Sequence, residues 1–276
     1  GDAGDELFGG YNRYFWSQRI WNKLSWIPPS LRRALSHGVH GISIDTWDSL
    51  SRILPSKIGI SGMGDKAHKL AHRLKSVDSL DNLYRSLVNE WPSDIGLVLG
   101  VKKSLHTKLD DTEIVKDLTE SEHRMMLWDS LTYLPDDILT KVDRAAMGVS
   151  LETRVPFLDH RVAELAWRIP KHMKIRNGQG KWALRQVLYK YVPRELIERP
   201  KAGFGVPVGK WLRGPLREWA ESLLETSRLH HEGYLNVDLV HQIWREHLSG
   251  KSDWTARIWA ILMFQAWLEV QKVEGK

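Results

Sequence analysis

Cysteine is absent from this sequence of 276 residues. Disulfide bonds, thiolate catalysis and zinc–thiolate sites are therefore excluded for these residues. Long apolar runs are lacking as well, since the longest candidate, residues 258–264, is far shorter than the roughly 20 residues that a membrane span needs. No secretory signal is recognisable at the start. We expect a protein of the reducing cytoplasm that has no membrane partner.

The excess of one charge sign is small, with 40 Lys and Arg residues against 34 Asp and Glu residues. The resulting net charge of +6 attracts anions in general, such as nucleotide phosphates, nucleic acids and acidic partners. The basic residues are scattered along the chain, which argues against a nucleic-acid partner. Hydrophobic residues make up 42% of the chain, as in ordinary globular proteins.

The first eleven residues, GDAGDELFGGY, interleave three carboxylates with small residues. This pattern predicts a tight loop that runs into a helix. Small residues let a ligand approach the backbone, and a helix start offers free N–H groups to anions. Acidic side chains at such a place indicate a divalent cation between them and a phosphate. The alternative is that Asp5 only caps the helix and Asp2 is a solvated loop residue.

Apolar spacing of three to four residues predicts helices along most of the chain, separated by proline, glycine and polar residues. One helix is expected to end, and the next to begin, at residues 134–137. Tryptophans in the last three helices are expected in the core. Four histidines without metal-ligand spacing, at positions 230, 231, 241 and 247, are expected on the surface. The predicted segments are 12–26, 31–39, 46–54, 66–74, 80–88, a helix from 120, 161–169, a helix from 181, 211–224, 237–248 and 254–270.

A second polar string lies at residues 134–159 and contains Lys141, Asp143 and Arg154. Its charges suit either a solvated helical face or a binding site. The planar fork of Arg154 can bind two oxygens of a carboxylate or phosphate at once. The alternative for Arg154 is a buried structural residue paired with Glu152 or Asp159.

Two further strings carry lysines beside glycines. Lys181 stands in the first turn of a predicted helix, where the helix dipole favours acids, so its position indicates an external anion. The alternative is an exposed lysine in a glycine-rich turn. Residues 199–207, RPKAGFGVP, predict a loop that can close over a site, with Lys201 as a candidate phosphate contact.

The four strings at 1–11, 134–159, 180–185 and 199–207 resemble, in order and spacing, the signatures of the synthetase domain of glutamine-dependent asparagine synthetases. The first signature of that family reads G-[DE]-G-x-D-E-[LIV]-F-G-G-Y, and this chain has Ala3 where glycine is most common. The resemblance implies a carbon–nitrogen ligase in which the aspartate side-chain carboxylate attacks the α-phosphate of ATP. β-Aspartyl-AMP and pyrophosphate form, and ammonia derived from glutamine then displaces AMP.

The resemblance also implies roles for individual residues. Asp2 would accept a proton from attacking ammonia, and Lys181 would stabilise charge on the α-phosphate and the leaving group. Asp5 would hold Mg²⁺. The remaining residues are contacts: Gly1, Gly4 and Lys201 for the nucleotide, and Lys141, Asp143 and Arg154 for the acid substrate.

The fold class implied is mainly α. Residues 1–276 would form the helical C-terminal part of an ATP-pyrophosphatase (adenine nucleotide alpha hydrolase-like) α/β synthetase domain that lacks most or all of its parallel sheet. The S-G-G-x-D-S pyrophosphate loop and an N-terminal glutaminase domain would precede Gly1. We therefore expect the back portion of a longer protein, which alone binds ATP poorly. A homodimer is a possible assembly.

Two other functions compete with this interpretation. β-Lactam synthetases and amidotransferases that act on sugars or peptides share the adenylating domain but use another acid or nucleophile. A non-catalytic helical module that binds nucleic acid or protein would also fit the positive charge and the 14 tryptophans.

Overall fold

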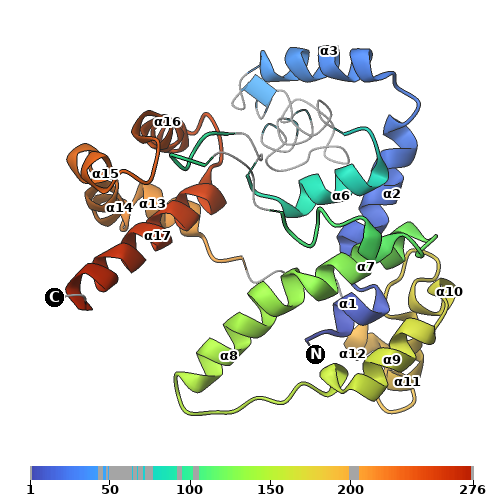
Figure 1. The fold of residues 1–276 in the computed structure, drawn as a ribbon. Helices are drawn as coiled ribbons and strands as arrows, with labels where there is room; N and C mark the ends of the chain where they lie inside the picture. Colours follow the sequence, from blue (N-terminus) through green and yellow to red (C-terminus); the bar gives the residue numbers. More distant parts are fainter. Residues whose placement is uncertain are drawn as a thin grey trace. The chain divides into compact units, whose positions relative to one another are not determined.

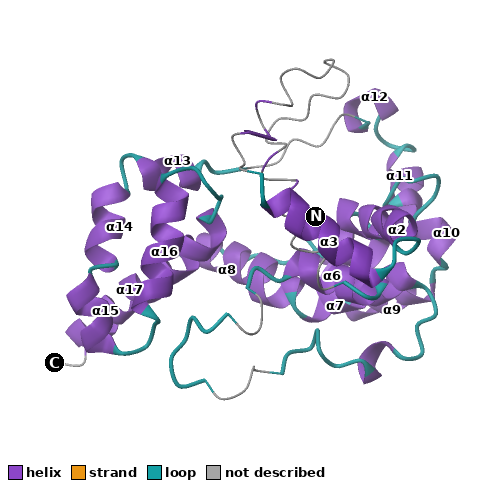
Figure 2. Ribbon diagram, turned by 90° about the horizontal axis from the view of Figure 1, so that it is seen from above, coloured by secondary structure: helices purple, strands orange, loops and turns teal. Residues whose placement is uncertain are grey.

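The computed structural model describes residues 2–42, 77–91, 95–101, 106–198 and 205–274, together with Thr46, Trp47, Ser49, Gly64, Ala67 and Ala71. Helices make up most of these residues, and no β-strand occurs among them (Figure 2). Backbone pairing of the β type is limited there to isolated bridges, Val98 with Leu235 and Arg176 with Gln179. The prediction of a mainly helical chain is confirmed for the described residues.

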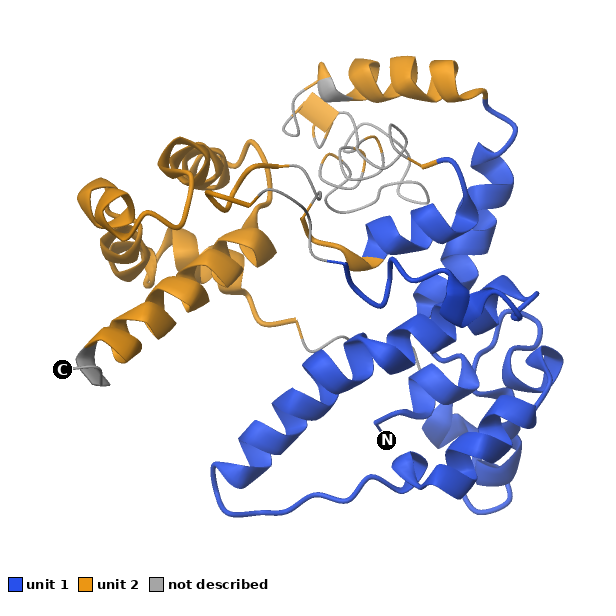
Figure 3. Ribbon diagram, in the orientation of Figure 1, with its two compact units in different colours: residues 1–27, 78–87, 105–202 blue, residues 28–77, 88–104, 203–276 orange. Residues whose placement is uncertain are grey.

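The chain divides into two compact units, which Figure 3 distinguishes by colour. Unit 1 comprises residues 1–27, 78–87 and 105–202, and unit 2 comprises residues 28–77, 88–104 and 203–276. Each unit is therefore assembled from segments that are distant in sequence. The assignment of residues 1–276 to one partial synthetase domain stays a prediction.

Unit 1 is built around the short helix α1, which contacts α7, α9 and α11 (Figure 1). Apolar side chains of α1, Leu7 and Phe8, are buried with Leu134 and Ala166. Asp159 caps α9 by accepting a hydrogen bond from the Arg161 N–H at 2.9 Å. The helices of unit 1 are α1 (Gly4–Phe8), α2 (Asn12–Leu24), α6 (Leu80–Val88), η1 (Glu113–Val115), α7 (Ser121–Leu131), η2 (Leu134–Leu139), α8 (Thr140–Met147), η3 (Pro156–Leu158), α9 (His160–Arg168), α10 (Lys171–Lys174), α11 (Trp182–Leu188) and α12 (Arg194–Ile197).

The helix expected to end at residues 134–137 ends at Leu131, and the next α-helix begins at Thr140. η2 is a π-helical segment that joins α7 to α8, and Figure 1 shows α8 leading on from α7 and away from α1. Pro135 has no N–H, so it cannot make the regular helical hydrogen bond, and a locally wider helix accommodates this. The Asp136 N–H still donates to the Thr132 carbonyl at 2.9 Å.

Unit 2 buries apolar residues of α17 against α13, α14 and α16. The helices of unit 2 are α3 (Pro29–His40), α13 (Val208–Arg213), α14 (Arg217–Leu223), α15 (Thr226–Glu232), α16 (Val237–Leu248) and α17 (Thr255–Glu274). The predicted segments 46–54 and 66–74 lie mostly outside the described residues. Within the described ranges, no helix combines the length and apolar character that crossing a membrane requires.

Two expectations for unit 2 are wrong. His247 is fully buried, because it shares one face of α16 with Val240, Ile243 and Trp244. Burial lowers the pKa of His247, and the neighbouring Arg213 guanidinium lowers it further. Trp211 of α13 and Trp267 of α17, both expected in the core, are 40% and 54% exposed. Because α17 is apolar around most of its circumference, periodicity could not show which of its faces is buried.

Candidate functional site

The acidic string folds as a loop of unusual backbone conformation followed by α1. Ala3, which precedes α1, has a left-handed φ of 63°, and Gly9, which ends α1, has a φ of 68°. A left-handed alanine costs on the order of 1 kcal/mol, whereas glycine adopts this conformation freely. The left-handed backbone at Ala3 explains why the first family signature most often has glycine at this position.

Lys181 and Asp5 form the polar centre of the site. The Lys181 Nζ donates to Asp5 Oδ2 at 2.7 Å, and each side chain is 24% exposed. The Lys181 backbone N–H donates to the Phe8 carbonyl at 2.9 Å, and its own φ of 56° is left-handed. The sequence indicated an external anion near Lys181, and in the structure the carboxylate of Asp5, in the first polar string, lies at this position.

Two glycines allow the acidic loop and the start of α11 to touch. A Cβ on Gly10 would overlap the Asp5 carboxylate and the Lys181 side chain. A Cβ on Gly180 would overlap the carbonyl of Gly9. Sequence reasoning did not assign Gly10 or Gly180 a role, although both lie in the strings that carry the resemblance. Gly180 permits a close approach of two backbones, and Gly10 leaves room for the side chains of Asp5 and Lys181.

Glu6, which follows Asp5 in the chain, is buried in the protein. Its side chain is 1% exposed, and Oε1 accepts a hydrogen bond from the Tyr11 hydroxyl at 2.7 Å. Burial raises the pKa of Glu6, while the Tyr11 hydrogen bond acts in the opposite direction. Glu6 is thus held inside the protein by a residue of the same polar string.

A buried ionic cluster beneath the loop was not predicted. Asp129 of α7 forms an ion pair with Arg13 Nη2 at 2.8 Å and accepts from Arg13 Nε at 2.9 Å. The hydroxyls of Tyr14 and Tyr84 also donate to Asp129, each at 2.5 Å. The sequence could have indicated this cluster, because Asp129 lies on an apolar helical face with Met125, Met126 and Trp128. A charge buried there requires partners.

The structure brings part of the predicted set together. Gly4 is the first residue of α1, and a Cβ there would lie 3.7 Å from the Lys181 Nζ, so Gly4, Asp5 and Lys181 are neighbours. Asp2 is half-buried and lies three residues before Asp5. Gly1 and Lys201 lie outside the described residues.

The predicted acid-substrate contacts are elsewhere in unit 1. Lys141 and Asp143 are exposed on α8, which leads away from α1 (Figure 1). The Lys141 Nζ lies 3.5 Å from Asp137 Oδ2. Arg154 pairs with Glu152 at 2.5 Å, as the alternative of a buried structural arginine predicted. Its side chain is nevertheless 83% exposed, so the predicted burial is wrong.

The described residues do not form a cluster of metal-binding side chains. Among the described residues, no group of three or more His, Cys, Asp or Glu side chains could hold a metal ion. Mg²⁺ in phosphate-transferring sites is commonly held by only one or two carboxylates together with phosphate oxygens. The partly exposed carboxylate of Asp5 fits that kind of ligand.

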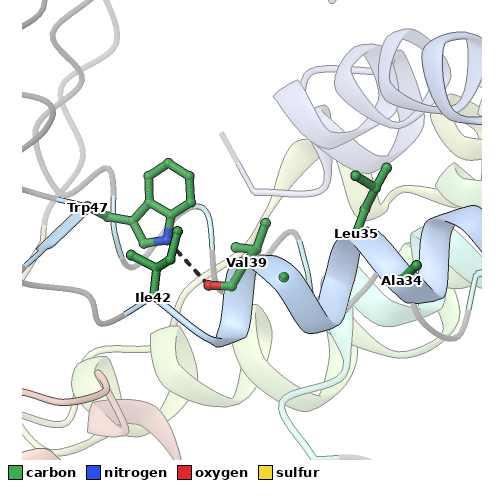
Figure 4. Close-up of a pocket in the computed structure, with 6 residues that line it drawn as sticks. Ala34, Leu35, Val39, Ile42 and Trp47 are labelled. Atoms are coloured by element: carbon green, nitrogen blue, oxygen red, sulfur yellow. Dashed lines mark hydrogen bonds between the residues drawn. The ribbon is translucent and has the colours of Figure 1, made fainter.

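A separate apolar hollow of about 360 Å³ lies on α3 of unit 2 (Figure 4). Trp47 closes one end, where its Nε1 donates to the Val39 carbonyl at 3.3 Å. Its lining consists of Ala34, Leu35, Gly38, Val39, Ile42 and Trp47. These uncharged side chains do not suit a nucleotide triphosphate, which needs cationic partners.

Comparison with known proteins places these features in a family. The Asparagine synthase family model matches residues 1–269. Asparagine synthetase [glutamine-hydrolyzing] 1 of Bacillus subtilis (strain 168) is 30% identical over 273 residues, which cover 97% of this chain and 39% of that protein. A putative asparagine synthetase [glutamine-hydrolyzing] of Mycobacterium bovis is 33% identical over 271 residues, with 97% and 38% covered. Asparagine synthetase [glutamine-hydrolyzing] of Homo sapiens is 29% identical over 143 residues, 45% of this chain and 24% of that protein.

The chain thus spans about two fifths of the length of the first two relatives. No solved structure matches it. Because the family model covers nearly the whole chain, including the segments that supply Asp5 and Lys181, the chain belongs to the asparagine synthase family.

Proposed function

We propose that the protein that carries this chain is an ATP-dependent, glutamine-hydrolysing asparagine synthetase, and that unit 1 supplies part of its synthetase site. Family membership and the names of the relatives support the reaction class. The observation that carries the proposal is the 2.7 Å contact between Asp5 and Lys181. It joins two polar strings that lie 176 positions apart in the sequence, as a shared site would require.

The proposed reaction has two steps. A side-chain carboxylate oxygen of aspartate attacks the α-phosphorus of ATP, and the bond to pyrophosphate breaks. The ammonia nitrogen then attacks the acyl carbon, the bond to AMP breaks, and the excess proton passes to a base. Lys181 would stabilise the negative charge on the α-phosphate and on departing pyrophosphate. Asp2 would accept the proton.

Asp5 would supply an oxygen ligand to Mg²⁺, whose charge would neutralise the triphosphate when bound. In the structure the carboxylate of Asp5 and the ammonium of Lys181 neutralise each other. Both proposed roles therefore require the pair to separate. A phosphate oxygen would replace Asp5 at the ammonium, and the cation would replace Lys181 at the carboxylate.

The finer parts of the proposal concern the whole protein. They are an ATP-pyrophosphatase-type fold with a parallel sheet, a glutaminase domain that supplies ammonia, a homodimer and a cytoplasmic location. Gly1, Gly4 and Lys201 stay predicted nucleotide contacts. Lys141, Asp143 and Arg154 stay predicted contacts of the acid substrate.

Pyrophosphate release by the protein that carries this chain tests the proposal, with ATP, Mg²⁺ and either aspartate or another carboxylic acid. We expect release with aspartate, and asparagine when glutamine or ammonium is added. Lys181→Met should lower kcat by about 10²–10³-fold, as for loss of a group that stabilises the transition state. Lys190→Met, at an exposed lysine just after α11, is the matched control. Turnover only with another acid would favour a related adenylating enzyme, and no turnover with any acid would contradict the proposal.

A further inference from the structure

Core contacts of Leu7 and Phe8 hold the apolar face of α1. Gly9 and Gly10 follow α1, and neither has a side chain that could pack. A Cβ on Gly10 would displace the side chains of the Asp5–Lys181 pair. The first side chain beyond α1 that can hold the loop is therefore Tyr11.

Tyr11 connects the loop to the interior. Its hydroxyl donates to Glu6 Oε1 at 2.7 Å, and Glu6 is the neighbour of Asp5 in the chain. Its ring lies 4.2 Å from the guanidinium carbon of Arg13, which also lies 4.7 Å from the ring of Tyr133. Arg13 thus makes cation–π contacts with both rings, which themselves pack edge to face at a centroid distance of 5.7 Å.

Arg13 is in turn fixed by α7. Its Nε donates to Asp129 Oδ2 at 2.9 Å, and its Nη2 forms an ion pair with Asp129 Oδ1 at 2.8 Å. Asp129 is 1% exposed and accepts further hydrogen bonds from Tyr14 and Tyr84. A side chain with this many partners inside the protein has one favoured orientation.

These contacts form an unbroken series from α7 to the acidic loop. We infer that Tyr11, held by Arg13 and Asp129, is a positioning residue that fixes Glu6 and thereby sets the geometry of the Asp5–Lys181 pair. The inference rests on the proposed function for its catalytic consequence. Its structural part concerns only unit 1 and can be measured without turnover.

The structural test uses the chain itself with its lysines dimethylated by ¹³C-formaldehyde, which keeps each amine charged. The NMR resonance of Lys181 is assigned by its loss in Lys181→Arg. In Tyr11→Phe, which keeps the ring against Arg13 but removes the hydroxyl, this resonance should move towards that of Asp5→Asn. Tyr189→Phe is the matched control, since its hydroxyl donates to Glu198 elsewhere in unit 1. An unchanged Lys181 resonance in a folded Tyr11→Phe variant would overturn the inference.

The catalytic test uses the protein that carries the chain. Tyr11→Phe should lower kcat on the order of 10- to 100-fold through misplacement, with a smaller change in the KM for ATP. Glu6→Gln keeps an oxygen acceptor for Tyr11 and should retain most activity, whereas Glu6→Ala should not. Equal losses in Glu6→Gln and Glu6→Ala would contradict positioning through this hydrogen bond. If the Lys181 resonance shifts but no acid is ever adenylated, the positioning stands and the proposed function fails.

Discussion

Replacement of Lys174 by methionine should stabilise the protein. Lys174 of α10 is fully buried, its Nζ has no hydrogen-bond partner, and the nearest favourable group is the ring of Trp167 at 4.8 Å. Burial lowers the pKa of Lys174 from the ordinary 10.5 to about 8. The folded state therefore binds fewer protons than the unfolded state between these pH values, so stability rises with pH across that window.

The magnitude follows from this difference in pKa. At pH 7 the amine is charged in both states, and a pKa of about 8 instead of 10.5 corresponds to a cost of about 3 kcal/mol in the folded state. The cation–π contact of Lys174 with Trp167 stabilises the folded state by about 1–2 kcal/mol, and Lys174→Met loses this contact. We expect a net gain for Lys174→Met of about 1–2 kcal/mol at pH 7.

Urea unfolding followed by circular dichroism at pH 7 and pH 10 measures this effect. The gain of Lys174→Met over the unsubstituted chain should shrink as the pH rises from 8 to 10, since deprotonation removes the cost. Lys171→Met on the same helix is the control, because Lys171 forms ion pairs with Glu120 and Glu122. Burial acts to lower the pKa of Lys171, but these carboxylates raise it overall, so its effect should not vary over this range. A pH-independent gain for Lys174→Met would refute the reasoning.

Three further substitutions follow from the packing. Gly10→Ala should destabilise unit 1 by about 2 kcal/mol or more, because its Cβ overlaps Asp5, and denaturant midpoints would show this. Asp129→Ala should cost about 3–5 kcal/mol by leaving the half-buried Arg13 without its counter-charge, and calorimetry of the variant would reveal it. Gly38→Ala, within α3 and with nothing within 4 Å of the new Cβ, should instead stabilise by up to about 1 kcal/mol, visible as a higher urea midpoint.

Local features of the fold could be predicted from the sequence. The expected segments 80–88 and 237–248 are α6 (Leu80–Val88) and α16 (Val237–Leu248) in the structure. In both, one apolar face repeats at helical spacing and polar residues mark the ends. α15 was not predicted, since a seven-residue helix offers too few repeats for its period to stand out.

The candidate site was predicted only in part. Asp5 and Lys181 were each singled out from their own neighbourhoods, but no local pattern could show that they touch each other. Arg154 was chosen for its chemistry, and its exposure depends on the path of the loop after α8, which periodicity does not specify. The apolar neighbours of Asp129 could have indicated a buried charge, but its donors come from α2 and α6, so the sequence could not identify them.

The discontinuity of unit 1 has a consequence for synthesis on the ribosome. α1 is made at the start of the described chain, yet the lysine that neutralises Asp5 follows 176 positions later. In between, the ribosome makes two segments that belong to unit 2. Closing so long a loop is slow compared with local helix formation. The contact between Asp5 and Lys181 therefore cannot form until Lys181 has emerged, and the site should be among the last parts of unit 1 to assemble.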